Sequence, residues 1–464
     1  MNEGLRRYFR YTSWPILLAT VALIGIGLAA LHAAERADPE LSGIAARQAI
    51  YATAGIIVMI AATIVPYRRL GGVAYLFFAV TLVLLVVVLL LPPVSGARRW
   101  IDLKVFRVQP SELAKLALIV MLAWYLRQGD HYRRLRGLIV PFVLTFIPMG
   151  LILVEPDLGT TLLLLPTLYF MLFMAGAKLR HLLGIIAVAT VLVALPLPQK
   201  LTSDMGERHK DARRLIAYTS FGRPGAEYVV VPAIVRGMRD HQVRRIAGWL
   251  RQGDPAVAQD AGFQLRLSKL VMGSGGLTGQ KLDNETARHF VRILPEHHTD
   301  FIFSVIAGQW GFLGCVLVLG GYAVILVFGA EIAAVTHDAF GRLLAVGVIG
   351  LLLSQLFVNL AVTMGLLPVT GMTLPFLSYG GSSLVVSCAA IGLLVNVGQR
   401  RPILLSRRPF EHGEKRERVP QPFGPLAEGR KPRPRPEATV TQSKRPTEAK
   451  EEDSSRTRSS RQSR

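Results

Sequence analysis

Long apolar stretches constrain this chain more than any other feature. Of its 464 residues, 51% are hydrophobic and 18% are charged, whereas soluble domains carry roughly 25% charged residues. The apolar residues are gathered into runs, and a helix needs about 20 of them to cross a bilayer. The sequence therefore predicts an all-α polytopic membrane protein. We expect ten spans, at about residues 14–33, 49–65, 71–91, 112–126, 138–154, 158–176, 182–198, 301–328, 343–364 and 377–397.

The distribution of Lys and Arg predicts the orientation in the membrane. Short cytoplasmic loops are enriched in these residues, and a cytoplasmic N-terminus places most basic segments on that side. These segments are Arg6 with Arg7 and Arg10, Arg68 with Arg69, residues 127–136, residues 178–180, and the C-terminal tail. Both termini are then cytoplasmic, and the long loop 199–300 lies on the outer side.

The chain divides by composition into a membrane domain, 1–400, and a tail, 401–464. The tail has 17 Lys and Arg, nine Asp and Glu, and no apolar periodicity, which predicts a disordered basic cytoplasmic segment. The net charge of +22 would suit nucleic acid. Basic loops beside apolar helices are explained more simply by anionic membrane lipids, so no nucleic-acid partner is expected. Cys315 and Cys388 lie in apolar spans and indicate neither a disulfide framework nor a metal site.

Basic residues on the predicted outer face depart from this charge rule. They are Arg47 and the cluster of Arg98, Arg99, Lys104 and Arg107. A basic loop beside the membrane is a candidate anion site, either for a lipid diphosphate or for ordinary anionic headgroups. Both interpretations stay open on the charge pattern alone.

Four carboxylates fall on the same face, each beside a predicted span. Glu112 begins the fourth span, Glu155 and Asp157 join the fifth to the sixth, and Asp300 precedes the eighth. Each has a structural explanation, because acidic residues stabilise helix N-termini and Thr or Asp can cap them. Carboxylates at membrane helix ends are nevertheless costly. Their common location favours a shared outward-facing cleft, in which Asp300 would accept a proton.

Other segments of the outer face allow two interpretations each. The run 229–235 is too short to span, and the amphipathic piece 243–250 is a candidate for the membrane surface. Gly273–Gly276 is either a plain turn or a close approach to a phosphate. The Gly- and Ser-rich stretch 365–383 either lets helices pack closely or forms a broken helix end that lines a cavity.

Six ordered stretches resemble the RodA/FtsW (SEDS) family of peptidoglycan glycosyltransferases. Together they cover the chain from about residue 14 to 400, and the ordered set is far more specific than any one of them. They are 98–103 (RRWIDL), 109–115 (QPSELAK), 155–160 (EPDLGT), 273–277 (GSGGL), 294–303 (LPEHHTDFIF) and 365–383 (GLLPVTG through SYGGSS).

The resemblance implies polymerisation of lipid II, a disaccharide-pentapeptide on undecaprenyl diphosphate, at the outer face of the bacterial cytoplasmic membrane. It implies ten spans, cytoplasmic termini and a class B penicillin-binding protein, a transpeptidase, as partner. The family's proposed catalytic aspartate matches Asp300. The substrate-binding candidates in the matching motifs and beside them are Arg47, Arg98, Arg99, Trp100, Glu112, Lys115, Glu155, Asp157, Glu296, His298, Ser378 and Ser382.

These residue types suit the chemistry. A sugar hydroxyl attacks an anomeric carbon while a diphosphate leaves, so a carboxylate base and positive charge are needed. We hypothesise that Asp300 is the base that accepts the proton of the acceptor hydroxyl. Arg47, Arg99 and Lys115 would then bind the diphosphate. A divalent cation held by the outer carboxylates is the alternative counter-charge, although the sequence shows no cage for one.

Two departures from the family pattern stand out. The segment 307–311 reads AGQWG where the family usually has a pair of Glu, and the outer loop 207–235 is longer than usual. The stretch 368–376 favours the elongation branch (RodA) over the division branch (FtsW). The competing functions are a lipid II flippase and a non-catalytic scaffold for a transpeptidase.

Overall fold

The structure of the chain is a computed structural model. It describes residues 11–92, 98–102, 107–155, 157–201, 207–223, 226–236, 238–260, 262–280 and 285–400, all within one unit, Met1–Ile403. The arginines at 6, 7 and 10, Lys104 and the tail 401–464 lie outside these ranges, so the predictions that depend on them stay predictions.

Each of the ten predicted spans coincides with a helix in the described residues. The helices are α2 (Trp14–Ala37), α3 (Ile44–Ile64), α5 (Ala74–Leu90), α6 (Pro110–Leu126), α7 (Ile139–Val154), α8 (Leu158–Ala175), α9 (Leu179–Ala194), α16 (Ile302–Val335), α17 (Ala339–Thr363) and α18 (Gly381–Gln399). Among the residues that the structure describes, seven helical segments are long and apolar enough to cross a membrane, and α5 and α9 are shorter apolar helices. The polytopic membrane fold is thus confirmed.

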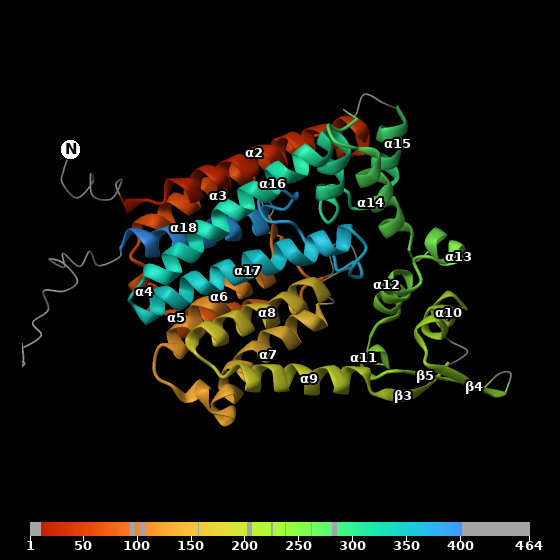
Figure 1. The fold of residues 1–464 in the computed structure, drawn as a ribbon, viewed down its shortest axis with the longest axis horizontal. Coiled ribbons are helices and arrows are strands. Elements are labelled where there is room, and N and C mark those ends of the chain that lie inside the picture. Colours follow the sequence, from red (N-terminus) through yellow and green to blue (C-terminus); the bar gives the residue numbers. More distant parts are fainter. Residues whose placement is uncertain are drawn as a thin grey trace, which may run out of the picture. The chain divides into compact units, whose positions relative to one another are not determined.

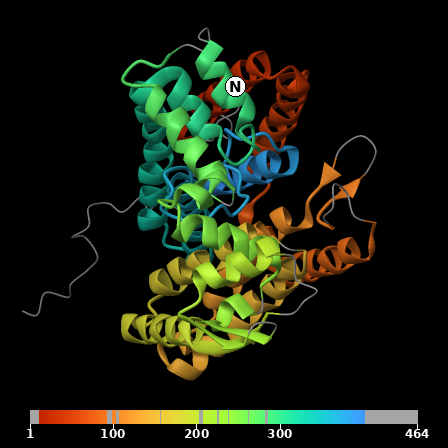
Figure 2. The ribbon, with the colours of Figure 1, turned by 90° about the vertical axis from the view of Figure 1, so that its right-hand side faces the viewer.

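The helices pack in pairs, and one of them, α6, lies at the centre of the bundle (Figures 1 and 2). α3 packs on α18, α2 on α16, α8 on α17, and α5 on α6. Every residue of α6 from Ala114 to Ala123 is buried, because α5, α7, α8, α17 and α18 all contact it. A helix enclosed on all sides can carry polar side chains without exposing them to lipid, and α6 carries Glu112 and Lys115.

Two predicted boundaries shift for local reasons. α9 ends at Ala194 rather than near 198, since Pro196 and Pro198 lack the N–H groups a helix needs and join strand β3 (Pro196–Lys200) instead. α18 begins at Gly381 rather than 377, and the preceding stretch 364–380 is irregular.

The loop 199–300, called the outer loop after its predicted side of the membrane, has a small core of its own at one end of the helices (right in Figure 1). Strands β3, β5 (Ala226–Pro232) and β4 (Thr219–Arg223) form an antiparallel sheet in the order β3-β5-β4. α10 (Glu207–Ile216), α11 (Ala233–Arg236) and α12 (Asp240–Leu250) accompany it. Val243 and Ala247 of α12 are buried in this core, so the 243–250 segment packs on protein rather than lying free on the membrane.

In the part of the chain that the structure describes, two sheets supplement the helices, because β1 (Ile101–Asp102) also pairs with β2 (Arg107–Val108). The remaining elements are short: α4 (Tyr67–Gly72), α13 (Pro255–Gln259), α14 (Phe263–Ser274), α15 (Glu285–Ile293), and the 3-10 turns Pro39–Leu41, His131–Arg133 and Leu135–Leu138.

The glycines after α14 meet α16 backbone to backbone. α16 is broken at Gly311, where φ is 64° and ψ is −157°. The N–H groups of Phe312 and Leu313 donate to the carbonyls of Gly276 and Leu277 at 2.9 and 3.1 Å. Gly273–Gly276 therefore serves close packing against a kinked membrane helix, and it does not line the cavity described below.

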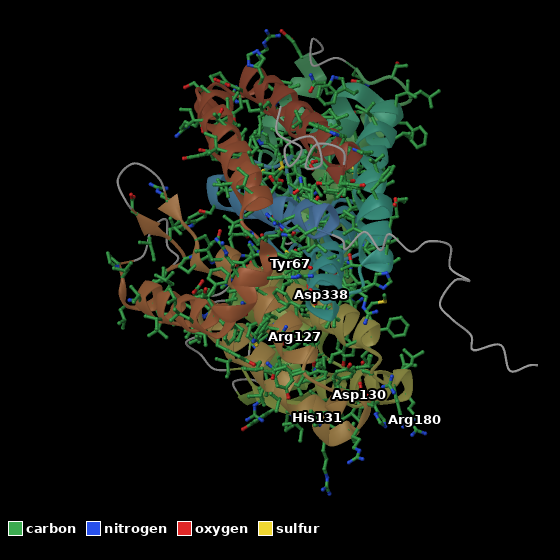
Figure 3. The ribbon with its side chains drawn as sticks, turned by 90° about the vertical axis from the view of Figure 1, so that its left-hand side faces the viewer. Tyr67, Arg127, Asp130, His131, Arg180 and Asp338 are labelled. Carbon is green, nitrogen blue, oxygen red and sulfur yellow. The ribbon has the colours of Figure 1, made fainter. Side chains whose placement is uncertain are left out.

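At the opposite end of the helices, Tyr67 donates a hydrogen bond to Asp338 (Figure 3). Asp338 also caps α17 by accepting from the Gly341 N–H. On α18, the amide of Asn396 donates to the carbonyls of Ala62, Thr63 and Val65 and so holds the end of α3.

Candidate active site

A polar cavity of about 810 Å³ lies at the end where the outer loop gathers. The starts of α3, α6, α8 and α18, the segment before α16, the stretch 371–380 and α12 all contribute to its wall. The predicted site residues that line it are Arg47, Arg99, Trp100, Glu112, Lys115, Asp157, Glu296, His298 and Asp300. Residues from five predicted spans and from several of the loops between them thus meet in one cleft.

Asp300 stands in the turn before α16, and it does not cap that helix. The N-cap position is Phe301, with no side-chain capping bond, so the capping explanation is wrong. Asp300 is partly open to the cavity but otherwise surrounded by protein. This desolvation, reinforced by the negative charge of Glu296, raises the pKa of Asp300 to about 7 even though Arg245 opposes the shift. Near neutral pH, Asp300 can therefore both lose and accept a proton.

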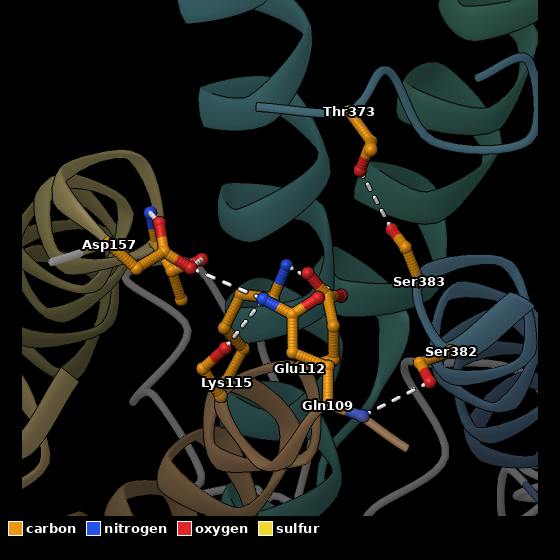
Figure 4. Close-up of polar contacts among 9 residues, drawn as sticks. Gln109, Glu112, Lys115, Asp157, Thr373, Ser382 and Ser383 are labelled. Atoms are coloured by element: carbon orange, nitrogen blue, oxygen red, sulfur yellow. Dashed lines mark hydrogen bonds and ion pairs between the residues drawn. The ribbon is translucent and has the colours of Figure 1, made fainter. Parts of the chain in front are cut away.

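Two carboxylates and a lysine form the wall contributed by α6 and α8 (Figure 4). Lys115 Nζ lies 2.8 Å from Glu112 Oε2, one turn apart on α6, and both side chains are buried. Asp157 caps α8 through the Thr160 N–H and also accepts from the Thr160 hydroxyl and the Gln109 amide. Glu112 and Asp157 thus lie at the N-termini of α6 and α8, where acidic residues stabilise a helix, and they also line the cavity.

Positive charge surrounds the cavity from several directions. Arg47 comes from α3, Arg99 from the loop before β1, and Lys115 from α6. The Arg99 Nε also donates to the carbonyl of Glu155 at 2.9 Å, and this hydrogen bond anchors the guanidinium group. An anionic group placed inside would meet cations from separate elements, an arrangement suited to a diphosphate.

Four predicted site residues lie outside the cavity wall. The Arg98 guanidinium donates to the Leu89 carbonyl instead, and Ser382 bonds the carbonyl of Arg107 while its neighbour Ser383 faces the cavity. Ser378 is buried behind the wall. Glu155 is fully buried, and desolvation together with Asp157 raises its pKa to about 8 despite Arg99.

Several lining residues were not predicted. α12 brings Arg245, His241 and Gln242 from the outer loop, and α17 brings Gln355. Tyr51 and Tyr379 also line the cavity, with ring centroids 6.5 Å apart. Arg245 reaches the Val369 carbonyl at 3.4 Å. The outer loop holds many other arginines, so no sequence signal distinguishes the one that turns inward.

His298 lies beside Tyr379, with ring centroids 5.9 Å apart. Burial, followed by the influence of His297, lowers the pKa of His298, so its imidazole is neutral at pH 7. It can therefore offer a neutral donor or acceptor at the cavity wall.

The described residues offer little to hold a divalent cation. They contain no group of three or more His, Cys, Asp or Glu placed to bind a metal ion. Both oxygens of Asp157 already accept hydrogen bonds, and Glu112 is paired with Lys115. These carboxylates are engaged by protein donors and do not fit a metal cage.

Comparison with known proteins identifies the family to which the chain belongs. Residues 12–402 match the FtsW/RodA/SpoVE family, described as cell cycle proteins. The chain is 31% identical to the peptidoglycan glycosyltransferase RodA of Treponema pallidum, covering 83% of this chain and 97% of that protein. It is 34% identical to a probable peptidoglycan glycosyltransferase FtsW of Trichlorobacter lovleyi, covering 86% and 96%.

A solved structure shares the fold. A chain from a peptidoglycan synthase complex, whose structure concerns the coordination of polymerisation and crosslinking, superposes with a TM-score of 0.65. It is 28% identical, and the match covers 84% of this chain and 99% of that one. With the family matched over nearly all the described residues, this chain belongs to the FtsW/RodA/SpoVE family.

Proposed function

We propose that this chain is a peptidoglycan glycosyltransferase that polymerises lipid II into glycan strands. The observation that carries the proposal is a single carboxylate with a pKa near 7, Asp300, in a cavity also lined by Arg47, Arg99 and Lys115. The relatives named as peptidoglycan glycosyltransferases support the same reaction class.

In the proposed reaction Asp300 accepts the proton of the acceptor sugar hydroxyl. The hydroxyl oxygen forms the new bond to the anomeric carbon of the donor, and the bond from that carbon to the diphosphate breaks. The diphosphate leaves with the electron pair, and its growing negative charge is stabilised by the fixed cations. Arg245 and Arg107 line the same cavity as Arg47, Arg99 and Lys115, so they belong to this set of cations.

The same proposal fixes the orientation. The cavity end faces the outside of the cytoplasmic membrane, where an activated lipid-linked donor needs no nucleotide, and both termini are cytoplasmic. At the far end, Arg127 and Arg180 lie on the face shown in Figure 3 with further basic side chains. We assign that end to the cytoplasm and to anionic lipid headgroups.

The proposed partner is a class B penicillin-binding protein, because crosslinking requires a transpeptidase and the related complex couples polymerisation to crosslinking. We place the chain in the elongation branch on the strength of residues 368–376. Relatives named RodA and FtsW match it at similar identity, so complementation of elongation-defective and division-defective cells is the test of the branch.

The test of the activity is polymerisation of purified lipid II by the chain co-purified with its transpeptidase. We expect glycan chains from the native protein and none from Asp300→Ala. Asp260→Asn, which changes an outer-loop carboxylate paired with Arg244 outside the cavity, should leave activity unchanged. Equal chains from native protein and Asp300→Ala would move the base elsewhere. No chains from any variant, with substrate competent in a control enzyme, would favour the flippase or scaffold functions.

A further inference from the structure

The backbone that carries Asp300 is fastened at three successive carbonyls. The carbonyl of His298 accepts from the Tyr379 N–H at 2.9 Å, and that of Thr299 accepts from the Ser378 hydroxyl. The carbonyl of Asp300 accepts from the Asn359 amide at 2.9 Å. All three donors come from the α17–α18 region, about 60–80 residues further along the chain.

Asn359 provides the deepest of these attachments. It lies on α17 with 2% of its surface exposed, and its amide nitrogen donates both to Asp300 and, at 2.8 Å, to the carbonyl of Met372. Because both partners are carbonyls, only the nitrogen can face them, which fixes the orientation of the amide. One side chain thus joins the Asp300 segment to the irregular stretch that forms another part of the cavity wall.

A second buried amide holds the same stretch from the other side. Gln48 on α3, 2% exposed, donates to the Ser378 carbonyl at 3.0 Å and accepts from the Gly380 N–H at 3.1 Å. The Ser378 hydroxyl in turn accepts from the Leu374 N–H. The stretch 372–380 has no regular secondary structure, so these side chains replace the missing ladder of backbone bonds.

We propose that Asn359 is a positioning residue, which holds the Asp300 carboxyl at the place in the cavity where a proton must be accepted. Ser378 supports the same segment by donating to the carbonyl of Thr299, the residue before Asp300. This explains why Ser378 belongs to a motif that matches the family although it does not line the cavity. The inference rests on the proposed role of Asp300 as base.

The test compares two buried asparagines that hold carbonyls at opposite ends of the chain's helices. Asn359→Leu removes the donors to Asp300 and Met372. Asn396→Leu removes the donors to Ala62, Thr63 and Val65, far from the cavity. Both should lower the thermal midpoint of the purified protein. Only Asn359→Leu should lower kcat for polymerisation, by about 10- to 100-fold, with little change in KM, because a displacement of about 1 Å is enough for such a loss.

A second readout needs no substrate. Infrared titration of the Asp300 carboxyl, assigned by its loss in Asp300→Asn, should show its pKa falling in Asn359→Leu as water gains access, and staying at the native value in Asn396→Leu. The groups that face it, Glu296, Arg245, Asp157 and His298, are unchanged in both variants. If Asn359→Leu does not fold, Ser378→Ala should show the same changes in milder form, and Ser378→Thr should restore native behaviour.

The outcomes separate the two claims. A native infrared pKa and native kcat in the folded Asn359→Leu or Ser378→Ala variant would overturn the positioning role. A shifted pKa in a chain that polymerises nothing, even as the native complex, would leave the positioning intact and overturn the proposed function.

Discussion

Arg245 and Asp300 face each other across Gly371. A β-carbon at Gly371 would lie 3.7 Å from Arg245 Nη1 and 3.7 Å from Asp300 Oδ2. The two charges are near enough for Arg245 to oppose the rise in the pKa of Asp300, and they form no direct ion pair. Arg245 thus belongs to the outer loop by sequence and to the cavity around Asp300 by position.

Removing this charge should make Asp300, the proposed base, harder to ionise. In Arg245→Met the pKa of Asp300 should rise above about 7, so less of the carboxylate form is present at neutral pH. The acid limb of the kcat profile should move to higher pH, and activity should rise at alkaline pH to a plateau below that of the native protein, because Arg245 also faces the proposed diphosphate site. Arg244→Met is the matched control, because Arg244 pairs with Asp260 at 2.6 Å outside the cavity; an equal shift in both variants would contradict the prediction.

Glu296 acts on Asp300 in the opposite direction. Its negative charge raises the pKa of Asp300, so Glu296→Gln should lower that pKa and move the acid limb of the kcat profile to lower pH. The variant should therefore outperform the native protein under mildly acidic conditions. Glu285→Gln, on the exposed start of α15, should leave the profile in place. An unmoved limb in Glu296→Gln would mean that the two carboxyls do not interact in solution.

The buried pair on α6 should be coupled. Lys115→Met leaves Glu112 charged, buried and without its partner, which should cost about 3–5 kcal/mol of stability. The double variant Lys115→Met with Glu112→Gln should regain most of this loss, because no lone charge remains. Polymerisation should stay low in both if Lys115 contacts the diphosphate. Thermal or denaturant unfolding and kinetics measured together test the idea; full activity in the stable double variant would remove Lys115 from the site.

Gly311 should not tolerate a side chain. Its φ of 64° and ψ of −157° suit only glycine, and a β-carbon there would overlap the backbone of Leu277 and Gly279. Gly311→Ala should therefore destabilise the protein by on the order of 3 kcal/mol or more. Gly320→Ala, on the same helix with open space around it, should be neutral or slightly stabilising. Equal midpoints for the two variants would show that the break in α16 is dispensable.

The sequence predicted the spans well because lipid requires long apolar helices and allows few other solutions. The sequence also predicted that Asp300, Arg47 and Lys115 lie at one end of the bundle. This prediction needed only the local motifs and the distribution of Lys and Arg along the chain. Arg245 was missed, because its direction is decided by how α12 packs between two cores. Ser378 and Glu155 were predicted as substrate-binding residues because their motifs match the family. Only the packing shows that they lie behind the cavity wall.

The outer loop packs on the membrane helices through α14, which contacts α16 and α17, and α12 links the loop to the cavity. On one face of α12, Arg245 reaches the cavity and Trp249 donates to the Gly365 carbonyl at 3.2 Å; on the other, Val243 and Ala247 enter the loop's own core. Within that core the buried Arg213 bonds Gln199 and Asp240, both at 2.8 Å, so the loop is internally braced. Substitutions on the solvent-facing side of that core should accordingly leave Arg245 at the cavity, provided that the packing of α12 is kept.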